Sequence, residues 1–246
     1  MAYTTINDPS AYFQATTYAG DSSNSTVITN GGNSDLQPDL VWIKNRTLAG
    51  GGSSNHMLFN SNVGIGTGAN SPYLISDSNA PETTNSNALQ AVSLNGFTPG
   101  SMTRTNETNS NFVAWQWKAN GGTTASNSDG SVTSTVQVNQ DAGFSIVTFD
   151  SASSGNFSVG HGLGVQPAMI ITKNREGTGQ WYTWHKDLTG GTSNTSYLLS
   201  LNRTDAEESY ANAWGAGVTS SVFGMQSGNT ATASNDYVAY CFNNVQ

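Results

Sequence analysis

Short apolar runs separated by turn-forming residues dominate this chain. The runs are rich in β-branched and aromatic residues, and Gly, Asn, Ser or Pro bounds them, which is typical of β-strands. The strands predicted in this way lie at residues 13–18, 40–44, 57–59, 73–75, 112–117, 144–149, 169–173, 181–184, 197–201 and 237–242. No segment keeps a helical period for three turns. At residues 204–210, where Thr204 is a candidate N-cap before acidic residues, we expect one helical turn at most. The pattern therefore predicts an all-β protein.

Two strands of this pattern have special features. The strand at 112–117 places Phe, Ala and Gln on one face and Val, Trp and Trp on the other, which indicates a central strand covered on both sides. Residues 132–138 alternate cleanly and predict a strand that opens the second half of the chain. No equally good segment precedes Phe13, so this extra strand is a candidate for pairing across domains or with a neighbouring subunit.

The pattern occurs twice along the chain. PDLVWIKNR at 38–46 matches PAMIITKNR at 167–175, and FQATTY at 13–18 matches FSIVTF at 144–149. Further along, YLIS at 73–76 matches YLLS at 197–200, GF at 96–97 matches VF at 222–223, and FVAWQW at 112–117 matches YVAYCF at 237–242. The five blocks keep the same order, with offsets of 124–131 residues that loop insertions and deletions explain. This period is too long for a solenoid unit and predicts two copies of one domain.

The two copies define the domain organisation. A stretch rich in Gly, Asn and Ser lies between them and is typical of a linker. We therefore predict a first β domain at 1–119, a linker at 120–131 and a second β domain at 132–246. We expect two tandem sandwich-like or jelly-roll-like domains that are related by internal duplication.

Composition narrows the range of partners and compartments. A net charge of −8 with only eight Lys and Arg residues argues against nucleic acid, because phosphate binding needs a basic surface. No apolar run predicts a transmembrane helix or a signal peptide, so we expect no membrane partner. We also expect synthesis in a cytoplasm, and the protein would stay there or leave within a larger assembly. The single cysteine, Cys241, excludes an internal disulfide, and we expect it to be a buried thiol.

Sequence motifs for catalysis or metal binding are not found. The Gly-rich segment around His161 resembles an oxyanion-hole loop, but no G-x-S-x-G elbow supplies a nucleophile. His56 and His185 have no partner at zinc-ligand spacing, and no calcium loop has its closing Glu. A glycan hydrolase would need two carboxylates that converge in the fold, and no such pair recurs in the two copies. We therefore expect a protein that is not an enzyme and that has no cofactor.

Tryptophans are the strongest candidates for ligand binding, because exposed indoles stack on sugar rings. Three of them align with apolar residues of the other copy and are expected in the core: Trp42, Trp115 and Trp117. The other three lack consistent aromatic partners and are the candidate ligand or interface residues: Trp181, Trp184 and Trp214.

The repeated Lys-Asn-Arg motif supplies a second set of candidates in a chain poor in cations. Its charged residues are Lys44 and Arg46 in the first copy and Lys173 and Arg175 in the second. At a strand end such side chains commonly close the rim of a domain. The alternative is a ligand or interface site at the same place in both copies.

Several motifs together resemble a known family. They are PDLVWIKNR at 38–46, NGFTPG at 95–100, FVAWQWKA at 112–119, AGFSIVTF at 142–149, GHGLGVQP at 160–167 and YVAYCF at 237–242. Over almost the whole chain, the sequence is similar to a repeated domain of structural proteins of marine tailed bacteriophages. The resemblance implies a place in large tail-fibre or virion-surface proteins and supplies no assigned catalytic residue.

The expected function is that of a phage virion structural protein, assembled in the host cytoplasm and displayed on the particle surface. It would be a head decoration (cement or knob) protein or a compact tail or fibre component that docks on capsid or tail subunits. The alternative is a carbohydrate- or receptor-binding module of a phage tail, with a host-surface glycan as its partner. A homo-oligomer is compatible with either expectation.

Overall fold

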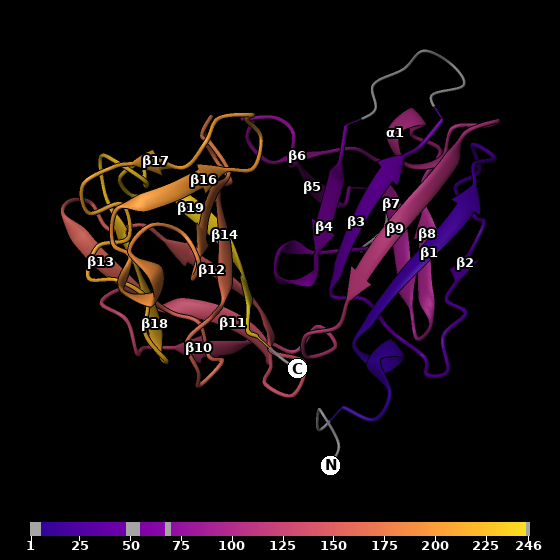
Figure 1. Cartoon of the computed structure of the whole chain (residues 1–246). Helices are drawn as coiled ribbons and strands as arrows, with labels where there is room; N and C mark the ends of the chain where they lie inside the picture. Colours follow the sequence, from indigo (N-terminus) through magenta and orange to yellow (C-terminus); the bar gives the residue numbers. More distant parts are fainter. Residues whose placement is uncertain (1–5, 48–54, 67–69, 245–246) are drawn as a thin grey trace. The chain divides into compact units, whose positions relative to one another are not determined.

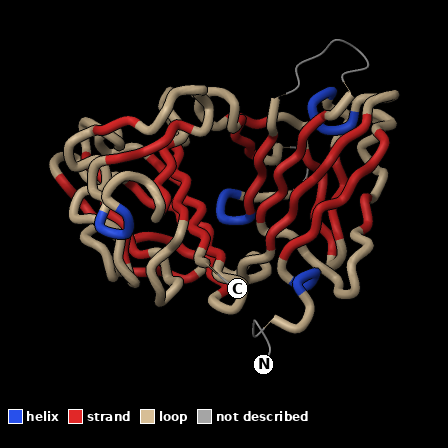
Figure 2. The backbone as a smooth tube through the Cα atoms, viewed as in Figure 1, coloured by secondary structure: helices blue, strands red, loops and turns tan. Residues whose placement is uncertain are grey.

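The computed structural model describes residues 6–47, 55–66 and 70–244, and short antiparallel strands make up most of its regular structure (Figures 1 and 2). The chain forms two compact units. The N-terminal unit comprises Ile6–Ser78 and Glu82–Gly122, and the C-terminal unit comprises Thr123–Gln246 together with Asn79–Pro81. Within the described residues the one α-helix is the short α1 (Thr103–Asn106). The prediction of a β-rich chain is therefore confirmed.

The N-terminal unit contains a six-stranded and a three-stranded sheet. The larger sheet has the order β1 (Phe13–Ala19), β9 (Asn111–Trp117), β3 (Leu40–Asn45), β4 (Met57–Asn60), β5 (Pro72–Ile75) and β6 (Thr83–Thr84). The smaller sheet has the order β2 (Ile28–Thr29), β8 (Gly96–Pro99) and β7 (Leu89–Ser93). Two single 3-10 turns, η1 (Pro9–Ala11) and η2 (Ser61–Val63), precede β1 and follow β4.

Both sheets of the N-terminal unit contribute to one apolar core. Successive residues of a strand point to opposite faces, and in β9 the buried Phe112 and Ala114 alternate with half-buried residues. They pack with Val41 from β3 and Phe97 from β8. One face of the larger sheet therefore covers the core, and the alternate positions of β3 and β9 lie on its other face.

The C-terminal unit contains an eight-stranded sheet and a separate pair of strands. The sheet has the order β10 (Ala125–Asn127), β11 (Ser134–Asn139), β12 (Phe144–Asp150), β19 (Asp236–Phe242), β14 (Met169–Asn174), β15 (Tyr182–His185), β16 (Tyr197–Ser200) and β17 (Glu208–Ser209). The pair consists of β13 (Asn156–Gly160) and β18 (Val222–Gln226), and the 3-10 turn η3 (Gly191–Ser193) lies between β15 and β16. The core of this unit lies between the sheet and the pair, since Phe157 and Phe223 pack with Val147 and Trp184.

The two large sheets share a pairing pattern. In the N-terminal unit β9 lies between β1 and β3, and in the C-terminal unit β19 lies between β12 and β14. Trp117 of β9 aligns with both Phe13 and Leu40. Phe242 of β19 aligns in the same way with Phe144 and Met169.

Three segments differ from, or add detail to, the expectations from sequence. The helical turn expected at 204–210 is wrong: Glu208–Ser209 forms edge strand β17, and Arg203 pairs with Asp205 and Glu208 at 2.6 and 2.9 Å. The extra strand expected at 132–138 is β11, which pairs with β10 and β12 of its own unit. Strand β10 itself lies within the segment expected to be a linker.

No helix in the described part of the chain is long and apolar enough to cross a membrane.

Candidate functional site

The tryptophans expected to bind ligands are buried in this structure. Trp181, Trp184 and Trp214 have no exposed surface. Nε1 of Trp184 donates to the carbonyl oxygen of Asn194 at 3.1 Å, and Nε1 of Trp214 donates to that of Tyr197 at 3.0 Å. The polar edge of these two indoles is therefore satisfied internally. In this conformation none of the three offers a face on which a ring could stack.

The partly exposed indoles are those that the repeat assigned to the core. Trp42 on β3 and Trp115 and Trp117 on β9 are half-buried. Together with His56 they line a shallow hollow of about 280 Å³. The core expectation for these three residues is wrong, because strand alternation places them on the face of the sheet opposite to the apolar core.

Cross-strand pairing arranges these rings in a row, which we name the aromatic strip and define as Phe13, Trp42, Trp115 and Trp117. Trp42 is directly opposite Trp115, with ring centroids 6.2 Å apart and planes at 77°. Phe13 is directly opposite Trp117, with centroids 5.0 Å apart and planes at 51°. The strip therefore crosses β1, β9 and β3, and Phe13 is 40% exposed at its β1 end.

His56 supplies the polar group of the hollow. Its ring stands edge-on to Trp42, and its Nδ1 accepts a hydrogen bond from Nε1 of Trp42 at 2.8 Å. This bond assigns the neutral tautomer with the proton on Nε2. Burial lowers the pKa of His56 below 6.5, and the nearby charge of Lys44 lowers it further, against an opposite effect of Asp77. The imidazole is therefore a neutral donor at pH 7.

Lys173, a candidate from the repeated motif, is fully buried in the C-terminal unit. Its Nζ donates to the carbonyl oxygens of Asn79 at 3.1 Å and Gly179 at 3.0 Å. Burial lowers its pKa from 10.5 to about 8. Because carbonyl groups are its hydrogen-bond acceptors, this ammonium holds backbone in place and is not presented to solvent. Lys44, its counterpart in the repeat, is half-buried on β3.

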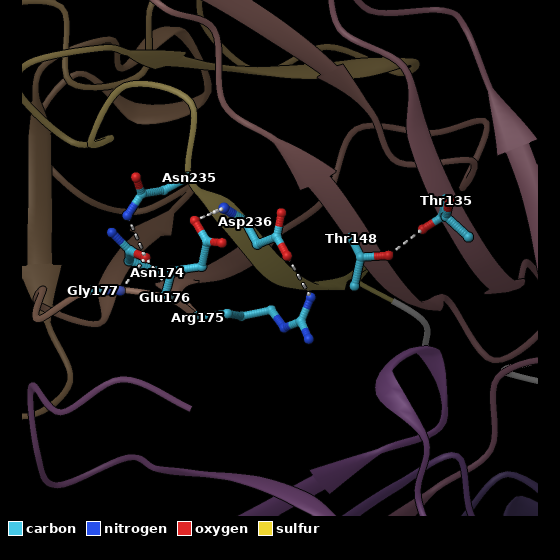
Figure 3. A network of polar contacts seen from close by, with 8 residues as sticks. All are labelled: Thr135, Thr148, Asn174, Arg175, Glu176, Gly177, Asn235 and Asp236. Atoms are coloured by element: carbon cyan, nitrogen blue, oxygen red, sulfur yellow. Dashed lines mark hydrogen bonds and ion pairs between the residues drawn. The ribbon is translucent and has the colours of Figure 1, made fainter. Parts of the chain in front are cut away.

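Arg175, which Figure 3 shows beside Asp236, lines a polar hollow of about 230 Å³ at the ends of β12, β14 and β19. Its guanidinium is 3.6 Å from the carboxylate of Asp236. Behind it, Oδ1 of Asn174 accepts from the backbone N–H groups of Glu176 and Gly177 at 3.0 and 2.9 Å. These bonds fold the chain sharply after β14 and position the arginine at the rim.

Two carboxyl groups share this polar hollow. Asp150 is directly opposite Asp236 in the register of β12 and β19. The hydrogen bond between their side chains and partial burial raise the pKa of Asp150. Asp150 therefore keeps its proton to a higher pH than an isolated aspartate does, beside Arg175 and Asp236.

Arg46 occupies a hollow of the same size at the matching place in the N-terminal unit. The hollow has a volume of about 230 Å³ and is lined by Thr17, Arg46 and Asn111, among others. The backbone N–H of Arg46 donates to Asn111 at 2.7 Å, as that of Arg175 does to Asp236 at 2.8 Å. An Asn thus stands where the C-terminal unit has Asp236, so the two hollows differ in charge.

The remaining histidines are His161 and His185. His161 is fully buried, and its Nδ1 accepts from the backbone N–H of Leu163 at 3.2 Å. His185 is half-buried and lies 3.7 Å from Asp187. Among the described residues no three His, Cys, Asp or Glu side chains are grouped so that they could hold a metal ion.

Sequence reasoning missed the aromatic strip although part of the signal was present. The alternation of β9 places Val113, Trp115 and Trp117 on one face. Comparison of the two copies obscured this signal. The residues that align with Trp115 and Trp117 in the second copy, Tyr240 and Phe242, are also apolar and therefore suggested a core role. The pairing of Trp42 with Trp115 and the hydrogen bond of Trp42 to His56 depend on tertiary structure.

A family model described as a domain of unknown function (DUF7483) matches residues 8–246, which cover nearly all of both units. No curated protein and no solved structure matches the chain.

Proposed function

We propose that this chain, which belongs to the DUF7483 family, is a structural protein of a tailed-bacteriophage virion, displayed on the surface of the particle. The resemblance of its motifs to those of structural proteins of marine tailed phages supports this proposal, and these motifs occur in both units. Its place is that of a head decoration protein or of a compact tail or fibre component, assembled in the host cytoplasm. Its partners are capsid or tail subunits.

The aromatic strip is the observation that carries the proposal. It exposes indole and phenyl surface on a sheet whose opposite face covers the core. Aromatic side chains bury a large area at little entropic cost and are enriched at protein interfaces. A rigid β-sheet that presents them is suited to docking, and we propose binding as the activity of this protein.

The carboxylates support binding over catalysis, because several of them fix loops. Asp21 accepts from the backbone N–H of Ser23 at 2.9 Å and from Thr26 at 2.5 Å. Asp77 accepts from the backbone N–H of His56 at 2.9 Å. Such bonds stabilise turns through side chains that mimic backbone acceptors. Acidic groups thus hold the shape of these loops, and the described residues contain few ion pairs that could do so.

We further propose that the two units are sandwich-like or jelly-roll-like domains that arose by duplication. The shared order of β1, β9 and β3 and of β12, β19 and β14 supports this, as do the matching registers around Trp117 and Phe242. The hollows at Arg46 and Arg175 lie at corresponding strand ends. Two similar domains in one chain can occupy two quasi-equivalent positions on a particle.

The test of the virion assignment is a binding experiment with empty heads of the phage that carries the gene. The molar mass of the purified protein is first measured by light scattering. The protein is then mixed with phage heads that lack this protein, and the fraction bound to the heads is quantified after sedimentation. Stoichiometric coating supports decoration. A lack of binding to both heads and isolated tails would overturn the proposal. Bovine serum albumin at equal concentration is the control for nonspecific sedimentation.

A carbohydrate- or receptor-binding module of the tail is the second candidate. The hollow formed by Trp42, His56, Trp115 and Trp117 favours it, because it combines exposed indole faces with a neutral hydrogen-bond donor. Binding to tails without binding to heads would favour this candidate over decoration.

A further inference from the structure

The hollow on the larger N-terminal sheet has the shape and chemistry of a small ligand site. Trp42, Trp115, Trp117 and His56 line a volume of about 280 Å³, close to the lower end of the roughly 300–1,000 Å³ of small-molecule sites. We propose that this hollow binds a pyranose ring of an uncharged glycan by stacking on its indoles. This inference rests on the receptor-binding candidate above and names the ligand class of its site.

The ring geometry supports stacking of a saturated ring. The planes of Trp42 and Trp115 meet at 77°, with centroids 6.2 Å apart, so the two indoles form adjoining walls and do not cover one another face to face. A pyranose has C–H groups that pack on an indole face and hydroxyl groups around its edge. One wall therefore takes the apolar face of the sugar while the hydroxyl groups stay at the open side of the hollow.

The hydrogen-bonding group of the hollow is a donor. The Nδ1 atom of His56 is occupied by Trp42 at 2.8 Å, which leaves the Nε2–H to donate. The backbone N–H of His56 donates to Asp77 at 2.9 Å, and this bond fixes the residue that carries the ring. A neutral donor suits the oxygen-rich edge of a sugar. It also has no charge that must be desolvated when the ligand binds.

Charge distinguishes a glycan from other ligands of aromatic sites. Indole walls also bind ammonium and guanidinium groups through cation–π contacts. Lys44 lies on β3 two residues from Trp42, on the same face of the sheet, and its charge acts on the ring of His56. At this ring the effect of Lys44 is larger than the opposite effect of Asp77. The charge of Lys44 therefore disfavours a cationic ligand such as a quaternary ammonium group or an Arg-rich peptide, and it does not disfavour an uncharged sugar.

The aromatic strip extends beyond the hollow. Phe13 packs on Trp117 and is 40% exposed. An oligosaccharide that places one ring against Trp42 and Trp115 can therefore continue over Trp117 towards β1. We expect affinity to rise from a monosaccharide to a trisaccharide, because each additional ring gains an aromatic contact.

The experiment is saturation-transfer NMR and calorimetry of the full chain with maltohexaose, cellohexaose and chitohexaose, each at up to about 10 mM. The expected result is saturable binding of at least one of these probes, with transfer strongest at the ring C–H protons. Trp115→Ala is expected to weaken that binding by about tenfold. Leu94→Ala removes an apolar side chain that is 77% exposed and is the matched control, for which affinity should not change.

Three outcomes would overturn the inference. The first is that none of the glycans binds, and the second is that a glycan binds equally well to Trp115→Ala. Choline and a proline-rich peptide are included, and binding of either one in place of the glycans would also overturn it. If Trp115→Ala fails to fold, as judged by its thermal transition, Trp42→Phe replaces it. This variant presents a smaller aromatic face and loses the donor to His56, so weaker binding is expected and unchanged binding would overturn the inference. Binding to phage heads or tails is measured separately, so glycan binding can fail while the virion assignment holds.

Discussion

The indole of Trp42 and the imidazole of His56 are joined by a hydrogen bond of 2.8 Å from Nε1 to Nδ1. The bond connects β3 to the start of β4 across the exposed face of the N-terminal sheet. It orients both rings at the hollow and determines which nitrogen of the histidine carries the proton. It also means that protonation of His56 must break this bond, because the imidazolium has no acceptor nitrogen.

The first prediction concerns the pH dependence that follows from this bond. Burial lowers the pKa of His56 in the folded protein below its ordinary value of 6.5, so the unfolded chain takes up the proton at a higher pH. This contribution to stability is fully present above pH 6.5 and is lost as the pH falls through the folded pKa. His56→Gln should reduce the loss of unfolding free energy between pH 7 and pH 5, measured by urea denaturation. His161, which also has a lowered pKa, is unchanged in the variant. Equal pH slopes in both proteins would contradict this prediction.

The second prediction concerns Asp39, which is 1% exposed. Its carboxylate accepts from the backbone N–H groups of Ala119, Gly121 and Gly122 at 2.7, 2.9 and 2.7 Å. Asp39→Ala leaves these donors without their acceptor and should lower the free energy of unfolding by about 2–4 kcal/mol. Chemical denaturation measures this change. Asp35→Ala, at an exposed position in the same loop, is the control and should change stability by less than about 0.5 kcal/mol. Similar effects of the two substitutions would refute the role assigned to Asp39.

The third prediction separates buried from exposed tryptophans. Trp184 is fully buried in the core of the C-terminal unit, and Trp184→Ala should cost about 3–5 kcal/mol because it leaves a large cavity. Trp115 is half-buried, and Trp115→Ala should cost about 1 kcal/mol, since it removes one cross-strand aromatic pair. Thermal unfolding of both variants tests the order. Iodide quenching of tryptophan fluorescence tests the assignment of buried and accessible indoles. We expect part of the wild-type fluorescence to stay unquenched, and Trp115→Ala to lose part of the fluorescence that iodide quenches.

The fourth prediction concerns Lys173. Burial lowers its pKa from 10.5 to about 8, so between these values the unfolded chain binds more protons than the folded chain. Lys173 therefore contributes a rise in stability as the pH increases from 8 to 10.5. Lys173→Met should lack this rise. Its overall stability should also be lower, since the carbonyl oxygens of Asn79 and Gly179 lose their donor. The test is the difference between the two stability profiles, in which titration of tyrosines and Cys241 cancels.

The fifth prediction concerns Cys241. It is completely buried on β19, and burial raises the pKa of its thiol to about 12. The thiolate is the reactive form, so we expect no reaction of the folded protein with Ellman's reagent at pH 8. In guanidinium chloride one thiol per chain should react, because the sequence contains one cysteine. Rapid labelling of the folded protein would show that β19 is accessible and would contradict the fold described for this unit.

Many of the strands could be recognised from the sequence, and others could not, some apolar strands among them. All ten segments predicted as strands coincide with strands, β1 and β19 among them. The predicted segments did not include β2, β6, β7, β8, β10, β13, β17 and β18. Of these, β6 and β17 carry no apolar signal, because they are two residues long and contain only polar residues. Their strand conformation comes from pairing with β5 and β16. Edge pairing of this kind depends on a neighbour that a local pattern does not contain.

The candidate site was predicted less well than the fold. Trp184 and Trp214 were chosen because they lack consistent aromatic partners in the other copy of the repeat. In the structure both are core residues. The choice of Arg175 and Arg46 placed them correctly at strand ends, and each lies at a hollow. Asp150 and Asp236 were not paired in advance, because they are far apart in the sequence and meet only through the register of β12 and β19.

The sequence by itself determined the β-rich character, most strand positions and which residues of each strand share a face, because side chains alternate with a period of two along any strand. Only the tertiary structure decided which face is covered. Trp115 and Ala114 are neighbours in β9, but Ala114 packs in the core while Trp115 lines the exposed hollow. The same applies to Lys173, a charged residue that is buried because the carbonyl oxygens of Asn79 and Gly179 accept its hydrogen bonds. Burial depends on contacts between segments that are distant in the chain, and a local pattern does not specify them.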